Sequence, residues 1–121
     1  MQKVMLIEDD ATMLSLLRTL LKMEGFETST LEDREDLLEA LRREKPDVIL
    51  LDVNLVFGNG IDFVRRIRAD NILEKIRVIM SSGMPLEAEC LAAGADSFLL
   101  KPYMPDTLVN AIRSILTTPR A

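Results

Sequence analysis

Short runs of consecutive apolar residues alternate along this chain with longer stretches in which apolar residues recur every three or four positions. Three of the runs, at 4–7, 48–51 and 78–80, are apolar throughout, which is typical of strands covered on both faces. The run at 98–100 predicts another strand of this kind. The run at 26–30 is more polar and suits a strand at the edge of a sheet.

Five helices are predicted between and after these strands. Gly25 ends the first helix, and the second stops before Pro46. The segment 58–60 turns the chain into the third helix, and Pro105 opens the last one. The fourth helix is predicted within 85–93 and is short.

This alternation of strands and helices predicts an α/β protein. Strand–helix–strand units impose a parallel sheet with helices on both faces. We therefore expect a doubly wound, five-stranded parallel sheet flanked by five helices, in the flavodoxin-like strand order 2-1-3-4-5. At this chain length we expect one domain over residues 1–117, with 118–121 as a tail or the start of a linker.

Polar residues follow four of the apolar strands directly. They are Glu8, Asp9 and Asp10 after the first strand, Asp52 and Asn54 after the third, Ser81 and Ser82 after the fourth, and Lys101, with Pro102 next to it, after the fifth. In a parallel sheet these four junctions meet at one edge, where open α/β folds bind their ligands. The sequence thus predicts one site, with carboxylates at its centre and a hydroxyl and an ammonium to one side.

Such a site suits phosphoryl transfer. Carboxylates packed together repel one another, and a magnesium ion, which prefers oxygen ligands, would compensate them. One carboxylate can serve as a nucleophile toward phosphorus, while Lys101 and Ser82 neutralise or bind the phosphoryl oxygens. Simpler interpretations exist for each junction taken alone. Asp10 or Asp9 could cap a helix, Asp52 and the serines could be turn formers, and Lys101 could be a surface lysine.

The composition excludes other chemistry. The chain has no histidine, which rules out Ser–His–Asp hydrolysis and histidine-based zinc sites. Its net charge of −5 disfavours direct nucleic-acid binding. Its longest apolar run is too short to span a bilayer, and its first residues lack a signal-peptide pattern. The single cysteine, Cys90, suits a packing role and a reducing cytoplasm, where we expect the protein to act.

Four motifs carry a family resemblance: LIEDD, LLDVNLVFGNG, VIMSSG and AAGADSFLLKPY. In order and spacing they resemble the receiver domains of bacterial two-component response regulators, over nearly the whole chain. The resemblance implies that Asp52 is the phospho-acceptor and Lys101 the phosphate-binding lysine. Ser82 matches the switch hydroxyl, although Ser81 beside it leaves that assignment open.

The resemblance also implies a magnesium site. Asp9 is the principal ligand, Glu8 its partner acting through water, and Asp52 a further ligand, while Asn54 gives a backbone carbonyl. Phe98 falls on the family's switch aromatic and is equally well interpreted as a core residue. Pro102 is expected to follow a cis peptide bond.

Two departures from the family pattern stand out. Val56 occupies a position where the family usually has proline. The segment 83–94 is a few residues shorter than usual, so the fourth helix is expected to be shortened. That helix belongs to a surface that receiver domains use for dimerisation and output. Its length therefore affects how this chain would transmit a signal to a partner.

The implied function is a phospho-acceptor switch. A partner histidine kinase or phosphotransfer protein would donate the phosphoryl group, and the changed surface would act on an output protein or domain, with a phosphorylation-dependent homodimer as a further expectation. Beyond self-phosphorylation from phosphodonors and autodephosphorylation, no turnover of an independent substrate is expected. The main alternative is a receiver-like interaction module that works without phosphorylation. A flavodoxin-type cofactor protein is disfavoured, because acidic residues stand where a Ser/Thr/Gly-rich phosphate cradle is required.

Overall fold

A five-stranded parallel sheet with helices on both faces forms the core of the computed structural model, which describes residues 1–31, 35–118 and 120. The sheet strands are β1 (Lys3–Ile7), β2 (Glu27–Thr30), β3 (Val48–Asp52), β6 (Arg77–Ser82) and β7 (Ser97–Leu100). The helices are α1 (Ala11–Met23), α2 (Leu37–Glu44), α3 (Gly60–Arg68), α4 (Glu87–Ala93) and α5 (Pro105–Thr117). Two short strands, β4 (Asn54–Leu55) and β5 (Gly58–Asn59), form a separate hairpin.

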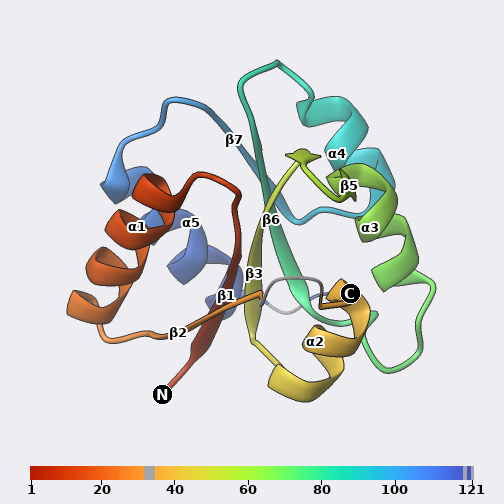
Figure 1. The fold of residues 1–121 in the computed structure, drawn as a ribbon, viewed down its shortest axis with the longest axis horizontal. Coiled ribbons are helices and arrows are strands. Elements are labelled where there is room, and N and C mark those ends of the chain that lie inside the picture. Colours follow the sequence, from red (N-terminus) through yellow and green to blue (C-terminus); the bar gives the residue numbers. More distant parts are fainter. Residues whose placement is uncertain (32–34, 119, 121) are drawn as a thin grey trace.

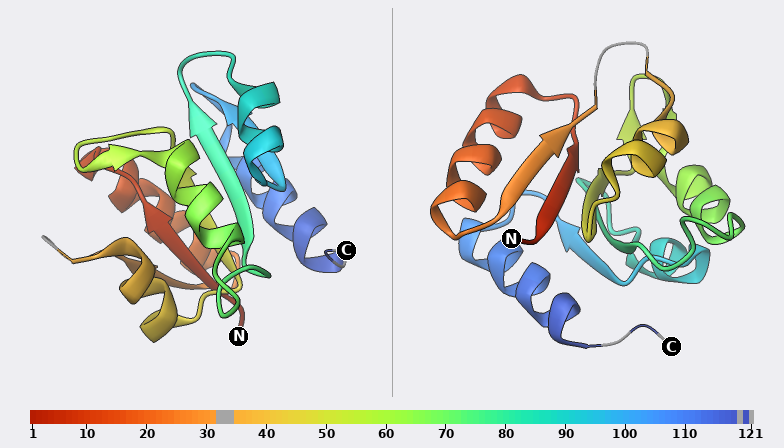
Figure 2. Two further views of the ribbon diagram at one scale, coloured as in Figure 1. Left: turned by 90° about the vertical axis from the view of Figure 1, so that its right-hand side faces the viewer. Right: turned by 90° about the horizontal axis from the view of Figure 1, so that it is seen from below.

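The strand order is β2-β1-β3-β6-β7, with every neighbouring pair parallel. When the sheet strands alone are counted, this is the predicted order 2-1-3-4-5. Helices α1 and α5 cover one face, and α2, α3 and α4 cover the other (Figure 1). The right-hand view of Figure 2, seen from below, shows the same three layers, with the sheet between the two sets of helices.

Successive side chains of the central strands point to opposite faces of the sheet and so contribute to two separate hydrophobic cores. Ile49 and Leu51 belong to the core under α2, α3 and α4, whereas Val48 and Leu50 belong to the core under α1 and α5. All four are at most 1% exposed. This explains why β3 is apolar throughout rather than alternating.

Helix boundaries follow from local capping. The Asp10 side chain accepts a hydrogen bond from the Met13 amide at 3.1 Å and caps α1, so the capping interpretation is correct for Asp10. Asp36 caps α2 in the same way, through the Glu39 amide. Gly94 ends α4 with a φ of 118°, a left-handed conformation that glycine adopts without strain.

The fourth helix is short, as predicted, with 7 residues in α4. It begins at Glu87 rather than near Pro85. Strand β6 is longer than its apolar run, and Ser81 and Ser82 are its last two residues rather than the start of a loop. Of the predicted tail at 118–121, residues 119 and 121 lie outside the described residues.

The β4–β5 hairpin was not predicted from the sequence. Asn54 pairs with Asn59 and Leu55 with Gly58 in antiparallel register. Only Val56 and Phe57 lie between the paired strands, so these two residues form the tip of the hairpin. The connection that follows the buried strand β3 is therefore an ordered structure and not merely a turn into α3.

Candidate functional site

The side chain of Lys101 joins two carboxylates that come from different strands. Its Nζ donates a hydrogen bond to Glu8 Oε2 at 2.9 Å and to Asp52 Oδ2 at 3.0 Å. Glu8 follows β1, Asp52 ends β3 and Lys101 follows β7. Three of the four predicted junctions thus converge on one point at the carboxyl edge of the sheet.

This ion-paired cluster is largely shielded from water. The side chains of Glu8, Asp52 and Lys101 are 4%, 12% and 23% exposed. Burial lowers the pKa of Lys101, but the hydrogen bonds to Glu8 and Asp52 outweigh it, and the net shift of the lysine pKa is upward. Lys101 therefore stays protonated and supplies a fixed positive charge beside Asp52.

The backbone around Asp52 is tightly packed. The Val53 amide donates to the Ser81 carbonyl at 2.9 Å, and the Gly60 amide donates to the Val53 carbonyl at 2.7 Å. A Cβ atom at Gly60 would collide with the Asp52 carbonyl oxygen. Position 60 therefore requires glycine because two backbones meet there.

Asn54 lies next to Asp52, as expected for a residue of the site. Its backbone amide is 3.3 Å from Asp52 Oδ1 in a hydrogen bond. The predicted role of its carbonyl as a metal ligand stays a prediction.

The two serines of β6 face opposite sides of the sheet. Both are buried, at 1% exposure for Ser81 and 0% for Ser82. Ser82 Oγ accepts a hydrogen bond from the Met84 amide at 3.0 Å, whereas no partner is present for Ser81 Oγ within the described part of the chain. Ser82 is two residues beyond Met80, so it shares a sheet face with Met80 and with Phe98, which is paired with Met80 in register.

Phe98 is half-buried and packs against the core under α2, α3 and α4. This contact fits its core interpretation, and a switching role stays a prediction. The bond between Lys101 and Pro102 is a cis peptide, as predicted.

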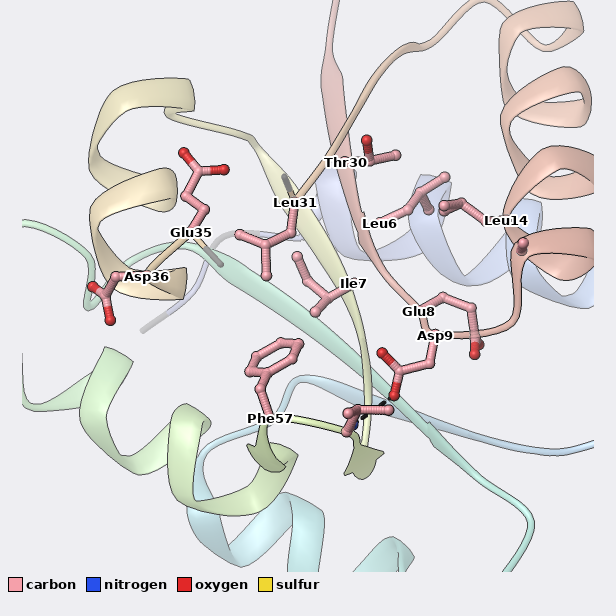
Figure 3. Close-up of a pocket in the computed structure, with 12 residues that line it drawn as sticks. Leu6, Ile7, Glu8, Asp9, Leu14, Thr30, Leu31, Glu35, Asp36 and Phe57 are labelled. Carbon is pink, nitrogen blue, oxygen red and sulfur yellow. Dashed lines mark hydrogen bonds between the residues drawn. The ribbon is translucent and has the colours of Figure 1, made fainter. Parts of the chain in front are cut away.

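Asp9 lies apart from the other acidic residues of the site. It is exposed, and its Oδ2 accepts a hydrogen bond from the Val56 amide at 2.7 Å. Figure 3 shows the Asp9 carboxylate turned toward the β4–β5 hairpin, while the Glu8 side chain extends in another direction. Among residues 1–31, 35–118 and 120, no group of three or more acidic, histidine or cysteine side chains is arranged to hold a metal ion.

The donor set nevertheless fits magnesium by its chemistry. Glu8 and Asp52 already converge on one compact cation, the Lys101 ammonium, and carboxylate oxygens are the ligands that magnesium prefers. Asp9 follows Glu8 directly in the sequence, and its carboxylate is turned toward Val56 in this structure. The sequence reasoning missed the Val56 amide, although one signal was present, since a non-proline residue at position 56 brings a free N–H.

A cavity opens beside Asp9, between the start of α1, the end of β2 and the hairpin. Its lining is mostly apolar, with carboxylates around it, and comprises Leu6, Ile7, Glu8, Asp9, Ala11, Leu14, Thr30, Leu31, Glu35, Asp36, Val56 and Phe57. Figure 3 shows Phe57 pointing into this space from the hairpin. The apolar tip of the hairpin thus borders the acidic site.

The fold and this site define a doubly wound α/β protein with an acidic, lysine-bridged centre at the carboxyl edge of its sheet. Residues 4–113 match the model of the response regulator receiver domain. The chain belongs to the response regulator receiver domain family, whose members are the phospho-acceptor switches of two-component systems.

Relatives and solved structures agree with this family. The DNA-binding response regulator MtrA of Mycolicibacterium paratuberculosis is 34% identical over 115 residues, which are 95% of this chain and 51% of MtrA. The chain therefore spans about half the length of the curated relatives it matches. The chemotaxis response regulator CheY4 of Vibrio cholerae superposes with a TM-score of 0.85 at 26% identity, covering 95% of this chain and 98% of CheY4. A response regulator structure from Chloroflexus aurantiacus gives a TM-score of 0.88 at 25% identity, with 97% and 98% covered.

None of the helices in the described ranges is both long and apolar enough to cross a membrane.

Proposed function

We propose that Asp52 is the phospho-acceptor of this receiver domain and that Lys101 and Ser82 bind the phosphoryl group it receives. The observation that carries this assignment is the contact of the Lys101 ammonium with Asp52 at 3.0 Å. A fixed positive charge beside a strand-end carboxylate is the arrangement that in-line phosphoryl transfer requires, because the reaction depends on positioning and charge neutralisation.

The donor is a phosphohistidine on a sensor kinase or phosphotransfer protein. One oxygen of the Asp52 carboxylate attacks phosphorus, the phosphorus–nitrogen bond of the donor breaks, and its electron pair returns to the imidazole ring. The product is an acyl phosphate on Asp52. The absence of histidine from the chain fits an acceptor whose donor lies on another protein.

Glu8, Asp9 and Asp52 would hold a magnesium ion, with the backbone carbonyl of Asn54 as a further ligand. When bound, magnesium neutralises the charge that builds up on the phosphoryl oxygens and holds them near the nucleophile. Glu8 would contribute through water, as the family resemblance implies. Asp10 remains peripheral, since its side chain caps α1.

The acyl phosphate carries about −1.5 to −2 charge, in place of the single negative charge of the Asp52 carboxylate. Ser82 then leaves its hydrogen bond with the Met84 amide and turns toward the new oxygens, while Lys101 exchanges a carboxylate oxygen for a phosphoryl oxygen. Phe98 occupies the space on the same sheet face that Ser82 leaves. Ser82 is favoured over Ser81 because it lies on the same sheet face as Phe98.

The altered surface would be recognised by an output domain or protein, in the cytoplasm where histidine kinases present their phosphorylated residues. Because the matched relatives are about twice as long as this chain, the output can reside in a segment beyond it or in another protein. A homodimer formed on phosphorylation is the other form this output can take.

Intact-mass spectrometry after incubation with acetyl phosphate and Mg²⁺ tests the assignment. Wild-type protein should gain one phosphoryl group, and Asp52→Asn should gain none. Asp62→Asn, which alters an exposed carboxylate on α3, should behave as wild type. Phosphorylation that persists in Asp52→Asn would refute Asp52 as acceptor, and a wild-type protein that takes up no phosphate would favour a phosphorylation-independent interaction module.

A further inference from the structure

The hydrogen bond between Asp9 and the Val56 amide depends on which residue occupies position 56. Val56 stands where the receiver pattern usually has proline, and proline has no amide hydrogen to donate. The hydrogen bond of 2.7 Å to Asp9 Oδ2 therefore exists only because this position carries another residue. With valine at position 56, the hairpin tip is hydrogen-bonded directly to Asp9.

This hydrogen bond opposes the arrangement of carboxylates that a metal ion needs. Glu8 and Asp52 face the same cation, Lys101, whereas Asp9 faces the hairpin. Within the described residues no three acidic side chains are arranged to hold a metal ion, so the Asp9 carboxylate has to turn from the hairpin before it can join the other two. A hydrogen bond from an amide to an exposed carboxylate has a net worth of about three- to tenfold in an equilibrium constant.

We infer that the Val56 amide holds Asp9 away from the site in the metal-free protein, so that Mg²⁺ binding must break this contact and release the hairpin. The inference rests on the proposed function and adds a regulation of its metal site. Val56 is thus a positioning residue that weakens metal affinity. Metal occupancy and the position of the apolar hairpin tip are coupled through one hydrogen bond.

The backbone at position 56 has the sign of φ that proline requires. Val56 and Phe57 are the two central residues of a tight hairpin, between Leu55 and Gly58. Among the described non-glycine residues, positive φ is confined to Lys45, so both central residues have negative φ, as a type I turn requires. Such a turn favours proline at its first central position and glycine at its fourth, which is where Gly58 lies.

Titration of ¹⁵N-labelled protein with MgCl₂, followed by NMR, tests the inference. Val56→Pro, which lacks the amide hydrogen, should bind Mg²⁺ about three- to tenfold more tightly than wild type. Val56→Ala keeps the amide hydrogen and removes most of the side chain, and it should match wild type. Unchanged or weaker binding by Val56→Pro would overturn the inference.

A second measurement needs no proline variant. In wild-type protein, saturating Mg²⁺ should speed solvent exchange of the Val56 amide hydrogen by about three- to tenfold, as should Asp9→Ala without metal. An amide that does not respond to Mg²⁺ in a protein that binds the ion would overturn this inference alone. Failure of wild type to bind Mg²⁺ at all would instead overturn the proposed metal site, and this inference with it.

Discussion

Lys101 and Asp52 are 49 residues apart in the chain, yet the lysine Nζ lies 3.0 Å from the aspartate Oδ2. The parallel sheet produces this proximity, because β3 and β7 both end at its carboxyl edge, separated only by β6. The same ammonium also contacts Glu8. One cation thus compensates two carboxylates that would otherwise repel each other in a partly dehydrated site.

Replacing this cation should destabilise the protein. Lys101→Met leaves Glu8 and Asp52 without their shared donor, and we expect the free energy of unfolding to fall by about 1–3 kcal/mol in metal-free buffer. Added Mg²⁺ should stabilise this variant more than it stabilises wild type. Urea denaturation with and without Mg²⁺ measures both effects, and Lys75→Met, at an exposed position, is the control. Equal Mg²⁺ responses in the two proteins would contradict a metal site at these carboxylates.

Gly60 should not tolerate a side chain. The Cβ of Gly60→Ala would press on the Asp52 carbonyl and on Val53, and overpacking of this kind destabilises by about 1–3 kcal/mol. Gly83→Ala is a matched control, because a Cβ there meets no atom within 4 Å. Thermal unfolding of the two variants should separate them clearly. Similar melting temperatures would show that the backbone at Asp52 is less constrained than the packing indicates.

Asp96 is expected to matter for stability rather than for phosphorylation. Its side chain, 7% exposed, accepts from Arg68 at 2.9 Å and from the Val78 amide at 2.8 Å, and Arg77 and Arg120 also contact it. Asp96→Ala leaves the partly buried Arg68 guanidinium without its carboxylate, at a cost of about 3 kcal/mol.

The exposed pair of Asp62 and Arg65 provides the comparison for Asp96. Asp62→Ala should change the free energy of unfolding by less than about 1 kcal/mol. Chemical denaturation of both variants, beside the acetyl phosphate assay, measures stability and phosphorylation separately. Loss of phosphorylation in a folded Asp96→Ala protein would contradict a purely structural role.

Tyr103, the only tyrosine of the chain, should report on high-pH stability. Burial raises its pKa to about 12, and its hydroxyl has no hydrogen-bond partner within the described residues. In the unfolded chain the phenol ionises near its ordinary pKa of about 10. The neutral phenol therefore stabilises the folded state fully below about pH 10, and this contribution is lost as the pH rises toward 12.

Ultraviolet absorbance of tyrosinate during a pH titration checks this expectation. Folded protein should titrate near pH 12, and protein in urea near pH 10. Tyr103→Phe removes the titrating group, and its stability should fall less between these two pH values. A native titration midpoint near 10 would show that Tyr103 is more accessible to water than its packing indicates.

The fold was predictable because its signals are local and repeated. Apolar runs mark β1, β3, β6 and β7, and the strand–helix alternation fixes a parallel sheet. The ends of strands and helices were less predictable where polar residues continue the element. Ser81 and Ser82, for example, are the last two residues of β6. The hairpin β4–β5 escaped prediction because strands of two residues leave no periodic pattern.

The sequence predicts which residues lie at the site better than it predicts the contacts between them. The sequence places Glu8, Asp52 and Lys101 at one edge of the sheet, and the structure joins them directly. The contact of Asp9 with Val56 was harder to foresee, because a non-proline residue at position 56 supplies an amide donor but does not determine its acceptor. The strand-end pattern also could not identify Asp96, because three arginines from distant segments meet there only in the folded chain.

The main chain at Asp52 is anchored on two sides, through Val53 to Ser81 and through Gly60 to Val53. Under the proposed function these hydrogen bonds hold the acceptor's main chain in place, so the response to new charge would come from side chains that can rotate around it. Ser82 and Lys101 both adjoin the β6 and β7 half of the sheet. Phosphorylation would therefore change side-chain positions first in that half of the sheet, toward α4 and α5.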